Sequence, residues 1–327
     1  ADITNLNDGP ITVTASVSDA HGNAAATASR TITLDNLAPQ VSIDATLEVD
    51  NIVNNAEEAS VVVTGTSAGA AGRTVTVTAT DINGLTDSGT ATIATDGTYS
   101  VTLDVNALAD GNLTITADVS DLAGNAAAQA SKTITLDDTA PTVTIDGTLE
   151  GDNKVNASED GDVVVSGSST GLAAGSTVSV TLADSSSTVS TTATVLSSGA
   201  WVAEPADISA LTDGNITVTA NASDTAGNAA SAATKTITLD NAAPTITIDA
   251  TLEGDNIVNI AEDATVVISG TTANVEDAQT VTVTFSDGTT TISKTASVSS
   301  DAFALTVGQL ADITNLNDGP ITVTASV

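Results

Sequence analysis

The sequence predicts an all-β protein, built as an elongated array of antiparallel β-sandwich domains. Motifs recur along the 327 residues at a nearly constant step. Between them, apolar and β-branched residues alternate with polar ones, as in strands that bury one face. Gly, Asn and Asp separate these stretches as turn residues, and no stretch of useful length has a helical period. These three observations predict the fold class.

Five motifs define the repeat, and a fixed period of this kind dictates architecture. The motif Asp-Gly-x-Ile/Leu-Thr-Val/Ile-Thr-Ala begins at Asp8, Asp110, Asp213 and Asp318, so its copies lie 102 to 105 residues apart. The other motifs keep this step: Ser-Asp-x-x-Gly-Asn-Ala-Ala from Ser18, Ser120 and Ser223; Thr-Ile-Thr-Leu-Asp from Thr31, Thr133 and Thr236; Ala-Pro ending at Pro39, Pro141 and Pro244; and Thr-Leu-Glu-x-Asp-Asn-x-Val-Asn from Thr46, Thr148 and Thr251.

The Ala-Pro pairs mark the predicted domain boundaries. Proline cannot donate a ladder hydrogen bond and favours an extended predecessor, which suits a short, stiff linker. Each complete unit then holds about 100 residues, enough to bury its own core. The predicted units are the C-terminal part of a domain (1–36), two complete domains (37–138 and 139–241) and the N-terminal part of a fourth (242–327).

The two ends of the chain are identical over 17 residues: 311–327 repeat 1–17 without a difference, whereas the internal copies have diverged. Two explanations are open. The chain is a window from a longer protein in which a three-domain unit recurs, an interpretation that its start at Ala1 favours. Alternatively, chains associate end to end into a filament, in which residues 18–36 of one chain complete the last domain of its neighbour by strand addition.

Within residues 37–138 the alternation predicts seven strands: 41–45, 60–66, 74–80, 89–94, 99–105, 112–119 and 131–136. Turn signals such as Asn83-Gly84 and Asp96-Gly97 separate them. Seven short strands in about 100 residues are typical of an immunoglobulin-like antiparallel sandwich. Tyr99, Trp201 and Phe303 open the same strand in successive domains, so each is predicted to fill the core of its own domain.

The composition excludes several classes of function. With 41 acidic and 6 basic residues, a net charge of −35 excludes a basic surface for nucleic acid or anionic membranes, and no apolar run is long enough to cross a bilayer. The chain has no Cys, so disulfides, thiol nucleophiles and thiolate metal sites are excluded. Since each domain core is poor in aromatic residues and no disulfide can form, a bound divalent cation is the natural additional source of stability.

Acidic residues recur in register where the strand order brings loops and linkers together. The loop after the first strand lies at the pole where the last strand leaves the domain, and the Gly-Asn loop of the next domain faces the same junction. Oxygen ligands without His or Cys favour Ca²⁺, because it accepts six to eight oxygens in loose geometry. Asp8 and Asp110 are instead interpreted as turn residues. The candidate Ca²⁺ ligands are Asp35, Asp137, Asp138, Asp240, Glu48, Asp50, Glu57, Glu150, Asp152, Glu159, Glu253, Asp255, Glu262, Asp121 and Asp224.

The motif Thr-Ile-Thr-Leu-Asp-Asn/Asp-x-Ala-Pro, joined to Ser-Asp-x-x-Gly-Asn, resembles the bacterial immunoglobulin-like (Big) tandem repeats of giant calcium-dependent adhesins of the RTX and biofilm-associated type. The resemblance covers essentially the whole chain. It implies an extracellular stalk at the bacterial cell surface, stiffened by interdomain Ca²⁺ and supporting adhesion or biofilm formation. Its partners would be neighbouring domains of the same protein, with Asp35, Asp137 and Asp240 as junction ligands. The glycine-rich nonapeptide repeats of RTX proteins are absent.

Two other classes of function compete with the stalk. Thr-x-Thr runs, for example Thr76/Thr78 and Thr114/Thr116, offer a row of hydroxyls to carbohydrate or ice, but threonine is also a common residue of solvent-facing strands. An enzyme is not expected, because no pair of carboxylates stands out beside an aromatic-lined cleft. The single His21 is replaced by Ala123 and Ala226 in the other copies, so it is interpreted as an exposed loop residue.

Overall fold

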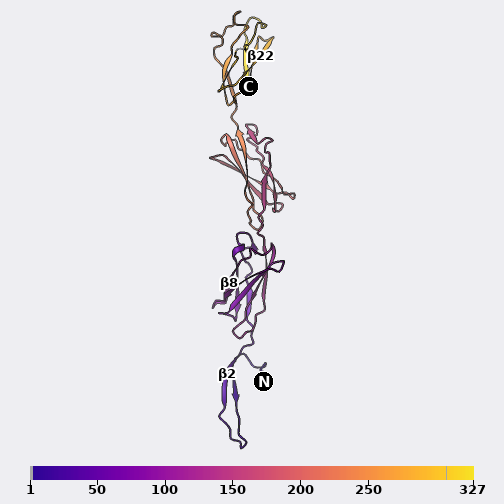
Figure 1. Ribbon diagram of the computed structural model, residues 1–327, viewed down its shortest axis with the longest axis vertical. Helices are drawn as coiled ribbons and strands as arrows, with labels where there is room; N and C mark the ends of the chain where they lie inside the picture. Colours follow the sequence, from indigo (N-terminus) through magenta and orange to yellow (C-terminus); the bar gives the residue numbers. More distant parts are fainter. Residues whose placement is uncertain (1–2, 307) are drawn as a thin grey trace.

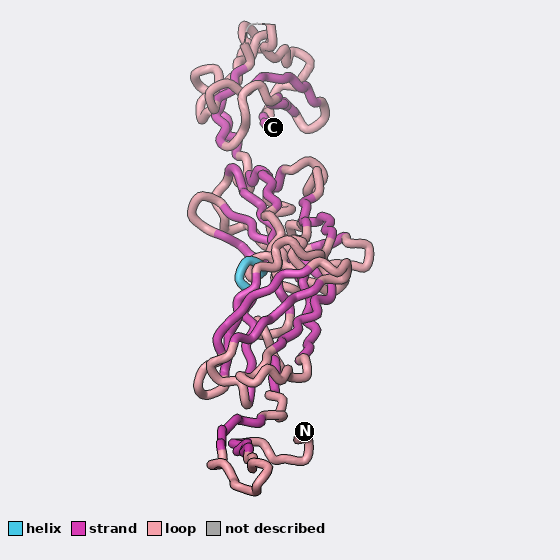
Figure 2. The backbone as a smooth tube through the Cα atoms, turned by 60° about the horizontal axis from the view of Figure 1, so that its bottom comes forward, coloured by secondary structure: helices cyan, strands magenta, loops and turns pink. Residues whose placement is uncertain are grey.

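A computed structural model describes residues 3–306 and 308–327, and shows β-sandwiches joined end to end in a rod (Figure 1). The N-terminal end is a hairpin of β1 (Gly9–Ala15) and β2 (Ala28–Leu34). Two complete sandwiches and a third, incomplete one follow. Strands and loops make up nearly the whole chain, and Figure 2 marks the single described helical turn, η1 (Glu58–Ser60). The all-β prediction is confirmed.

The first complete sandwich packs a three-stranded sheet against a five-stranded one, with the orders β3-β5-β8 and β4-β10-β9-β6-β7. Six of the seven predicted strands lie within about two residues of observed ones, and the fourth begins three residues earlier, at Thr86. The strands are β3 (Gln40–Ile43), β4 (Ile52–Val53), β5 (Val61–Ala68), β6 (Thr74–Thr80), β7 (Thr86–Thr92), β8 (Thr98–Leu103), β9 (Gly111–Asp118) and β10 (Ala130–Leu136).

The short strand β4 was not predicted. It lies inside the predicted loop 46–59 and pairs with β10 in parallel, Ile52 beside Thr135 and Val53 beside Leu136. Two residues are too few to show an alternating pattern, which is why the sequence does not reveal it. Its consequence is that β10 is enclosed between β9 on one edge and β4 on the other.

The second sandwich repeats this topology, with sheets in the orders β11-β13-β16 and β12-β18-β17-β14-β15. Again the last strand lies between an antiparallel neighbour, β17, and a short parallel one, β12. The strands are β11 (Thr142–Ile145), β12 (Lys154–Asn156), β13 (Ser166–Thr170), β14 (Thr177–Ala183), β15 (Thr188–Thr194), β16 (Ala200–Val202), β17 (Gly214–Asn221) and β18 (Ala233–Asp240).

The third sandwich has two three-stranded sheets, in the orders β19-β20-β23 and β22-β21-β24. Its described residues include no counterpart of β10 or β18, and residues 257–258, which correspond to β4, form no strand. The strands are β19 (Thr245–Ile248), β20 (Ser269–Ala273), β21 (Thr280–Ser286), β22 (Thr291–Ser297), β23 (Ala302–Ala304) and β24 (Thr322–Ser326).

An aromatic ring at the equivalent position is buried in each core, as predicted: Tyr99, Trp201 and Phe303 are at most 4% exposed. Each ring lies against a glycine of the neighbouring strand. A methyl group on Gly167 would stand 2.4 Å from the Trp201 ring and 1.9 Å from the carbonyl oxygen of Thr144. The glycine is therefore required by the ring and by the adjacent strand.

A repeated aspartate, absent from the predicted site, anchors two loops of each sandwich. Asp81 is 7% exposed, and its carboxylate accepts hydrogen bonds from the backbone N–H groups of Asn83, Leu85 and Ala109. Asp184 and Asp287 make the equivalent bonds in the next two sandwiches. These hydrogen bonds, chiefly the one from the Ala109 N–H, hold the pKa of Asp81 below its ordinary value of 3.8.

We expect Asp81→Asn to lower the melting temperature of the first complete sandwich at neutral pH. Because the pKa of Asp81 is lower in the folded than in the unfolded chain, its contribution is present above pH 3.8 and is lost as the pH falls through the folded value. The gap between parent and variant should therefore close on acidification. Calorimetry at several pH values measures this difference in melting temperature. Asp184→Asn should instead lower the melting temperature of the second sandwich. A gap independent of pH would contradict this role.

Candidate functional site

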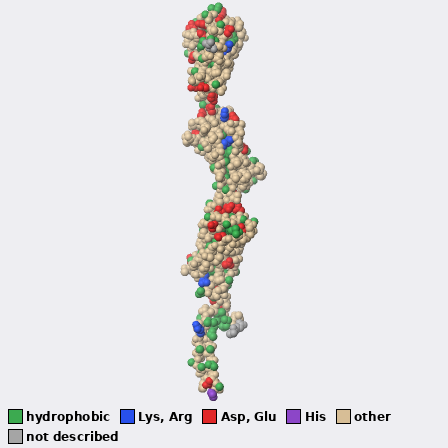
Figure 3. Space-filling model, in the orientation of Figure 1, with side chains coloured by type: hydrophobic (Ala, Val, Ile, Leu, Met, Phe, Trp, Pro, Cys, Tyr) green, Lys and Arg blue, Asp and Glu red, His purple; other side chains and the backbone are tan. Residues whose placement is uncertain are grey.

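The candidate site is the set of junctions between successive sandwiches. Figure 3 shows Asp and Glu side chains gathered at the narrow regions where one sandwich meets the next. At each of these places a linker leaves the last strand of one domain, and a loop of the following domain faces it.

The Ser-Asp-x-x-Gly-Asn motif forms a tight loop in which the aspartate orients the asparagine. The Asp121 carboxylate accepts hydrogen bonds from the backbone N–H of Asn125, at 2.9 Å, and from its side-chain amide, at 2.8 Å. These bonds, that from the amide foremost, hold the pKa of Asp121 below its usual range. Asp224 orients Asn228 in the same way. Both aspartates were predicted as metal ligands, and here they position an amide.

The oriented asparagine binds the preceding sandwich. Asn228 is fully buried; its amide donates to the Asp137 carbonyl oxygen at 2.7 Å, and its side-chain oxygen accepts from the Asn55 N–H at 2.8 Å. A third bond runs from the Asn54 amide to the Ala226 carbonyl oxygen at 3.1 Å. One such bond recurs at the first junction, where Asn125 donates to the Asp35 carbonyl oxygen. Direct, specific hydrogen bonds thus bridge the first and second junctions.

The Asp-Gly aspartates fix the linker rather than their own turns. Asp110 accepts from the backbone N–H of Asp138 at 3.0 Å and from the Thr139 hydroxyl at 2.7 Å. Asp8 accepts from the N–H of Asn36, and Asp213 from that of Asn241, each at 3.0 Å. The backbone N–H partner lies 28 residues away in every case, so local turn patterns in the sequence do not reveal it.

The loop after the first strand holds the other predicted ligands, and each makes a defined hydrogen bond. The first glutamate binds the next long strand or the segment leading to it, Glu48 at Val62 N–H and Glu150 at Val164 N–H. The aspartate in the middle of the loop accepts a hydrogen bond from the backbone N–H of the residue two positions after it. The last glutamate accepts one from the backbone N–H of the residue three positions before it. The remaining bonds are Glu253 with Val267, Asp50 with Ile52, Asp152 with Lys154, Asp255 with Ile257, Glu57 with Asn54, Glu159 with Asn156, and Glu262 with Asn259.

Like charges accumulate at the second junction. Burial and the nearby carboxylates of Asp224 and Asp110 raise the pKa of Asp137. Burial, followed by the neighbouring Asp138, raises the pKa of Glu58, whose Oε2 is buried without a hydrogen-bond partner. Both shifts mean that the ionised forms are disfavoured here. A cation at this junction would relieve that cost.

At the third junction the acidic residues surround open space. A cavity of about 350 Å³ is lined by the predicted ligands Glu150, Asp152, Glu159 and Asp240, by Lys154 beside them, and by Glu276 of the following sandwich. A second cavity, of about 410 Å³, lies beside Asp213, Asp240, Glu276 and Asp301. Carboxylates from two successive sandwiches therefore share one cavity.

The donor set fits Ca²⁺, because it consists of carboxylate, amide and carbonyl oxygens. In the structure, the carboxylates of the acidic loop, such as Glu150, Asp152 and Glu159, accept hydrogen bonds from nearby backbone N–H groups. The described residues contain no group of three or more acidic or His side chains arranged to hold a metal. Ligation would thus require side-chain rotation at the junctions. Asp35, Asp137, Asp138 and Asp240 lie at the linkers, where such an ion would sit.

The threonine pairs and the histidine that suggested a binding or catalytic function have ordinary structural positions. Thr78 lies opposite Thr116 across the β6–β9 pair, and the Thr116 hydroxyl reaches the Thr78 carbonyl oxygen. His21 is exposed in the loop of the β1–β2 hairpin. Within the described residues, no helix has the length and apolar character needed to cross a membrane.

Two family models match parts of the chain. A model described as "Bacterial Ig-like domain" matches residues 42–138 and 142–241, and one described as "Bacterial Ig-like domain (group 3)" matches residues 205–313. Among curated proteins, none matches the chain.

Several solved structures are similar in sequence. A tetra-tandem repeat in the extending region of a large adhesion protein is 35% identical, covering 99% of this chain and 79% of that one, with a TM-score of 0.35. A Ca²⁺-stabilised adhesin that helps an Antarctic bacterium reach out and bind ice is 30% identical over 97% of this chain and 80% of that one, with a TM-score of 0.43. Because the first family model matches more than half of the residues, the chain belongs to the family of bacterial Ig-like domains.

Proposed function

We propose that the chain is a structural extender, a stalk segment of a large bacterial cell-surface adhesin that holds a binding domain away from the cell. The observation that carries the proposal is the end-to-end arrangement of sandwiches (Figure 1), with hydrogen bonds across the first and second junctions. Each added repeat lengthens such a rod without changing its width. The adhesin context is taken from the two related chains that are 35% and 30% identical.

We propose further that each domain begins at an Ala-Pro pair, as the repeats predict, and that the linkers between them bind Ca²⁺. At the second junction the ligands would come from Asp137 and Asp138, with Asp224 contributed by the next sandwich. The raised pKa of Asp137 supports this, because it reflects carboxylates brought together without a counter-charge. At the third junction Asp240, Glu150, Asp152 and Glu159 line the shared cavity.

The affinity required is modest. Extracellular modules bind Ca²⁺ with dissociation constants of about 10⁻⁴ to 10⁻³ M. If free Ca²⁺ stands tenfold above such a value, each site adds about 1.4 kcal/mol to the free energy of unfolding. The second effect is on shape, since an ion held by two domains restricts the angle between them. The proposal places the protein outside the cell and gives it a structural rather than a catalytic role.

The test is small-angle scattering and calorimetry of the full chain with millimolar Ca²⁺ and then with excess chelator. We expect chelation to broaden the distribution of end-to-end distances and to lower the melting temperatures. The reason is that removing the ion restores repulsion between the carboxylates of adjacent domains. An unchanged shape and melting curve would contradict cation binding. The carboxylates would then be solvated surface charges without a bound ion.

A matched pair of variants locates the effect. Asp137→Asn combined with Asp138→Asn removes two charges from the second junction, so it should weaken Ca²⁺ binding in titration calorimetry and reduce the response to chelation. Asp19→Asn is the control, because this aspartate occupies the position of Asp224 at the end of the described chain, where no preceding sandwich contributes carboxylates. Equal losses in both would contradict a site at the junction.

A further inference from the structure

One asparagine outside the junctions stands next to a group that can react with it. Asn83 is the only asparagine of the chain that precedes a glycine. In such a pair the backbone nitrogen of the glycine can attack the side-chain carbonyl carbon of the asparagine, because glycine has no Cβ to obstruct the approach. In a folded protein this attack depends on solvent exposure, on the partners of the amide and on the freedom of the backbone.

Asn83 lies in the turn that connects β6 to β7, in the first complete sandwich. Both Asn83 and Gly84 are exposed. Gly84 has a φ of 83°, and a Cβ added to it would meet no atom within 4 Å. The turn therefore protrudes into solvent, where water reaches the reacting atoms and no neighbouring group obstructs their movement.

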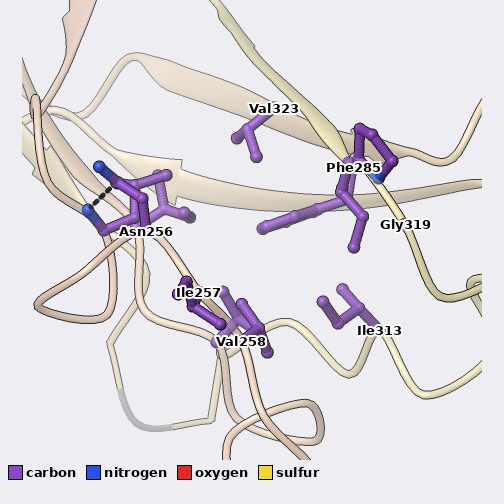
Figure 4. Close-up of a pocket in the computed structure, with 12 residues that line it drawn as sticks. Asn256, Ile257, Val258, Phe285, Ile313, Gly319 and Val323 are labelled. Atoms are coloured by element: carbon purple, nitrogen blue, oxygen red, sulfur yellow. Dashed lines mark hydrogen bonds between the residues drawn. The ribbon is translucent and has the colours of Figure 1, made fainter.

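The side chain of Asn83 makes no hydrogen bond with the described residues, whereas other asparagines are held in place. Asn256, labelled in Figure 4 at the wall of an apolar cavity, accepts a hydrogen bond from the Leu252 N–H through its side-chain oxygen. The amides of Asn125 and Asn228 are bound at the junctions. A free amide can rotate toward the next backbone nitrogen, but a bound one must first break its hydrogen bonds.

The attacking nitrogen is restrained by a single long hydrogen bond. The Gly84 N–H donates to the Asp81 carbonyl oxygen at 3.1 Å, toward the upper end of the usual range. On either side of it, the N–H groups of Asn83 and Leu85 donate to the Asp81 carboxylate at 2.8 Å. The turn is thus held at its neighbours, and its weakest hydrogen bond is at the nitrogen that would react.

We propose that Asn83 is a site of spontaneous deamidation in the folded protein. The Gly84 nitrogen forms a bond to Cγ of Asn83, the Cγ–Nδ2 bond breaks, and the amide leaves as ammonia with the proton of the Gly84 N–H. The product is a cyclic succinimide. Water then opens the ring at one of its two carbonyl groups, which gives aspartate or, when the main chain runs through Cγ, isoaspartate. Water is the only co-reactant, and nothing is oxidised or reduced.

Isoaspartate would alter the backbone where it supports the Asp81 anchor. The main chain gains one carbon between residues 83 and 84, and the N–H groups of residues 83 and 85 both donate to the same Asp81 oxygen. The turn must therefore open. Asp81 also holds the Ala109 N–H, next to Asp110, which binds the linker of the second junction. The change weakens the first sandwich and reaches that junction through these two aspartates.

The equivalent turns of the other sandwiches lack this site. Two positions after the anchoring aspartate stand Ser186 and Thr289, whose backbone N–H groups donate to Asp184 and Asp287 as that of Asn83 donates to Asp81. These turns, 184–187 and 287–290, are also one residue shorter. Because no asparagine precedes a glycine there, the change should be confined to the first sandwich.

The experiment is prolonged warm incubation of the full chain in neutral buffer, followed by tryptic peptide mapping. Cleavage after Arg73 and Lys132 yields a peptide that contains Asn83 together with Asn112 and Asn125. We expect aspartate and isoaspartate, distinguished by electron-transfer fragmentation, to accumulate at position 83 while the other two remain amides. Conversion at Asn83 no faster than at these two, or conversion only in denaturant, would overturn the proposal.

Asn83→Gln is the matched control, because it keeps an amide but moves its carbonyl carbon one bond further from the Gly84 nitrogen. It should show no product at position 83 and should keep its melting temperature through the incubation. Asn83→Asp, measured when fresh, adds the charge without the extra backbone carbon and should melt close to the parent.

The incubated parent should melt earlier in its first sandwich, with the second unchanged, because only the first contains the reactive pair. Calorimetry of parent and Asn83→Gln before and after incubation measures this shift. If the parent carries isoaspartate at position 83 and still melts like incubated Asn83→Gln, the link to the Asp81 anchor is wrong. The outcome does not depend on cation binding, so the same result is expected in Ca²⁺ and in chelator.

Discussion

Trp201→Ala should lower the free energy of unfolding of the second complete sandwich by about 3–5 kcal/mol, the usual cost of truncating a large buried aromatic residue. Trp201 is fully buried at the centre of its core. The other residues of this core are aliphatic, so no neighbouring ring can move into the cavity. The loss should appear in calorimetry as an earlier transition for one sandwich, with the others unchanged.

Trp201→Phe is the matched control and should cost much less. The third sandwich carries Phe303 at the same position, and the indole N–H of Trp201 is buried without a hydrogen-bond partner among the described residues. Gly167→Ala approaches the same contact from the facing strand. It should cost at least the ~1–3 kcal/mol typical of overpacking, because the added methyl would overlap a backbone carbonyl oxygen as well as the ring. Normal melting of Trp201→Ala would show that the ring is not the centre of this core.

Asn228→Ala should loosen the second junction while leaving both adjacent sandwiches folded. The substitution removes the hydrogen bonds to the Asp137 carbonyl and the Asn55 N–H. Leaving buried polar groups without hydrogen-bond partners costs about 1–3 kcal/mol. Here this cost weakens the contact between the two sandwiches. Scattering, or distance measurements between labels on the two sandwiches, should show a broader range of interdomain angles.

Asn23→Ala is the control for this experiment. Asn23 makes the same bonds to Asp19 that Asn228 makes to Asp224, but it lies in the terminal hairpin, where the described chain has no preceding sandwich. It should therefore reproduce the local loss without the change in shape. If Asn228→Ala leaves the angle distribution unchanged, the junction is held by other contacts.

The sequence predicts the fold well because the strands are regular and the repeat supplies independent copies of each. The alternation of apolar and polar residues in β6 and β9 is strict, so their bounds differ from the predicted ones by at most one residue. The prediction missed β4, which is two residues long and whose pairing is with a strand about 80 residues away. Period-two patterns do not reveal pairings of this kind.

The candidate site could be predicted only in part. Strand order indicates that Asp224 and Asn228 face the linker that carries Asp137, and the structure brings these residues together. The sequence does not show that Asp121 and Asp224 orient an amide, or that Asp110 holds the linker 28 residues away. Composition reveals that oxygen ligands are present, whereas the bonds each oxygen makes depend on tertiary contacts.

The position of β10 between β9 and β4 determines how the rod would respond to pulling. The chain enters the first complete sandwich at β3 and leaves it at β10, at opposite poles, so a load applied along the rod acts on these two strands. β10 is held by an antiparallel neighbour over seven residues and by a parallel one over two. Load parallel to a strand shears its ladder bonds together, whereas load across it would open them one at a time. We therefore expect high mechanical resistance from a domain with few aromatic residues, because this resistance comes from the direction of its strands.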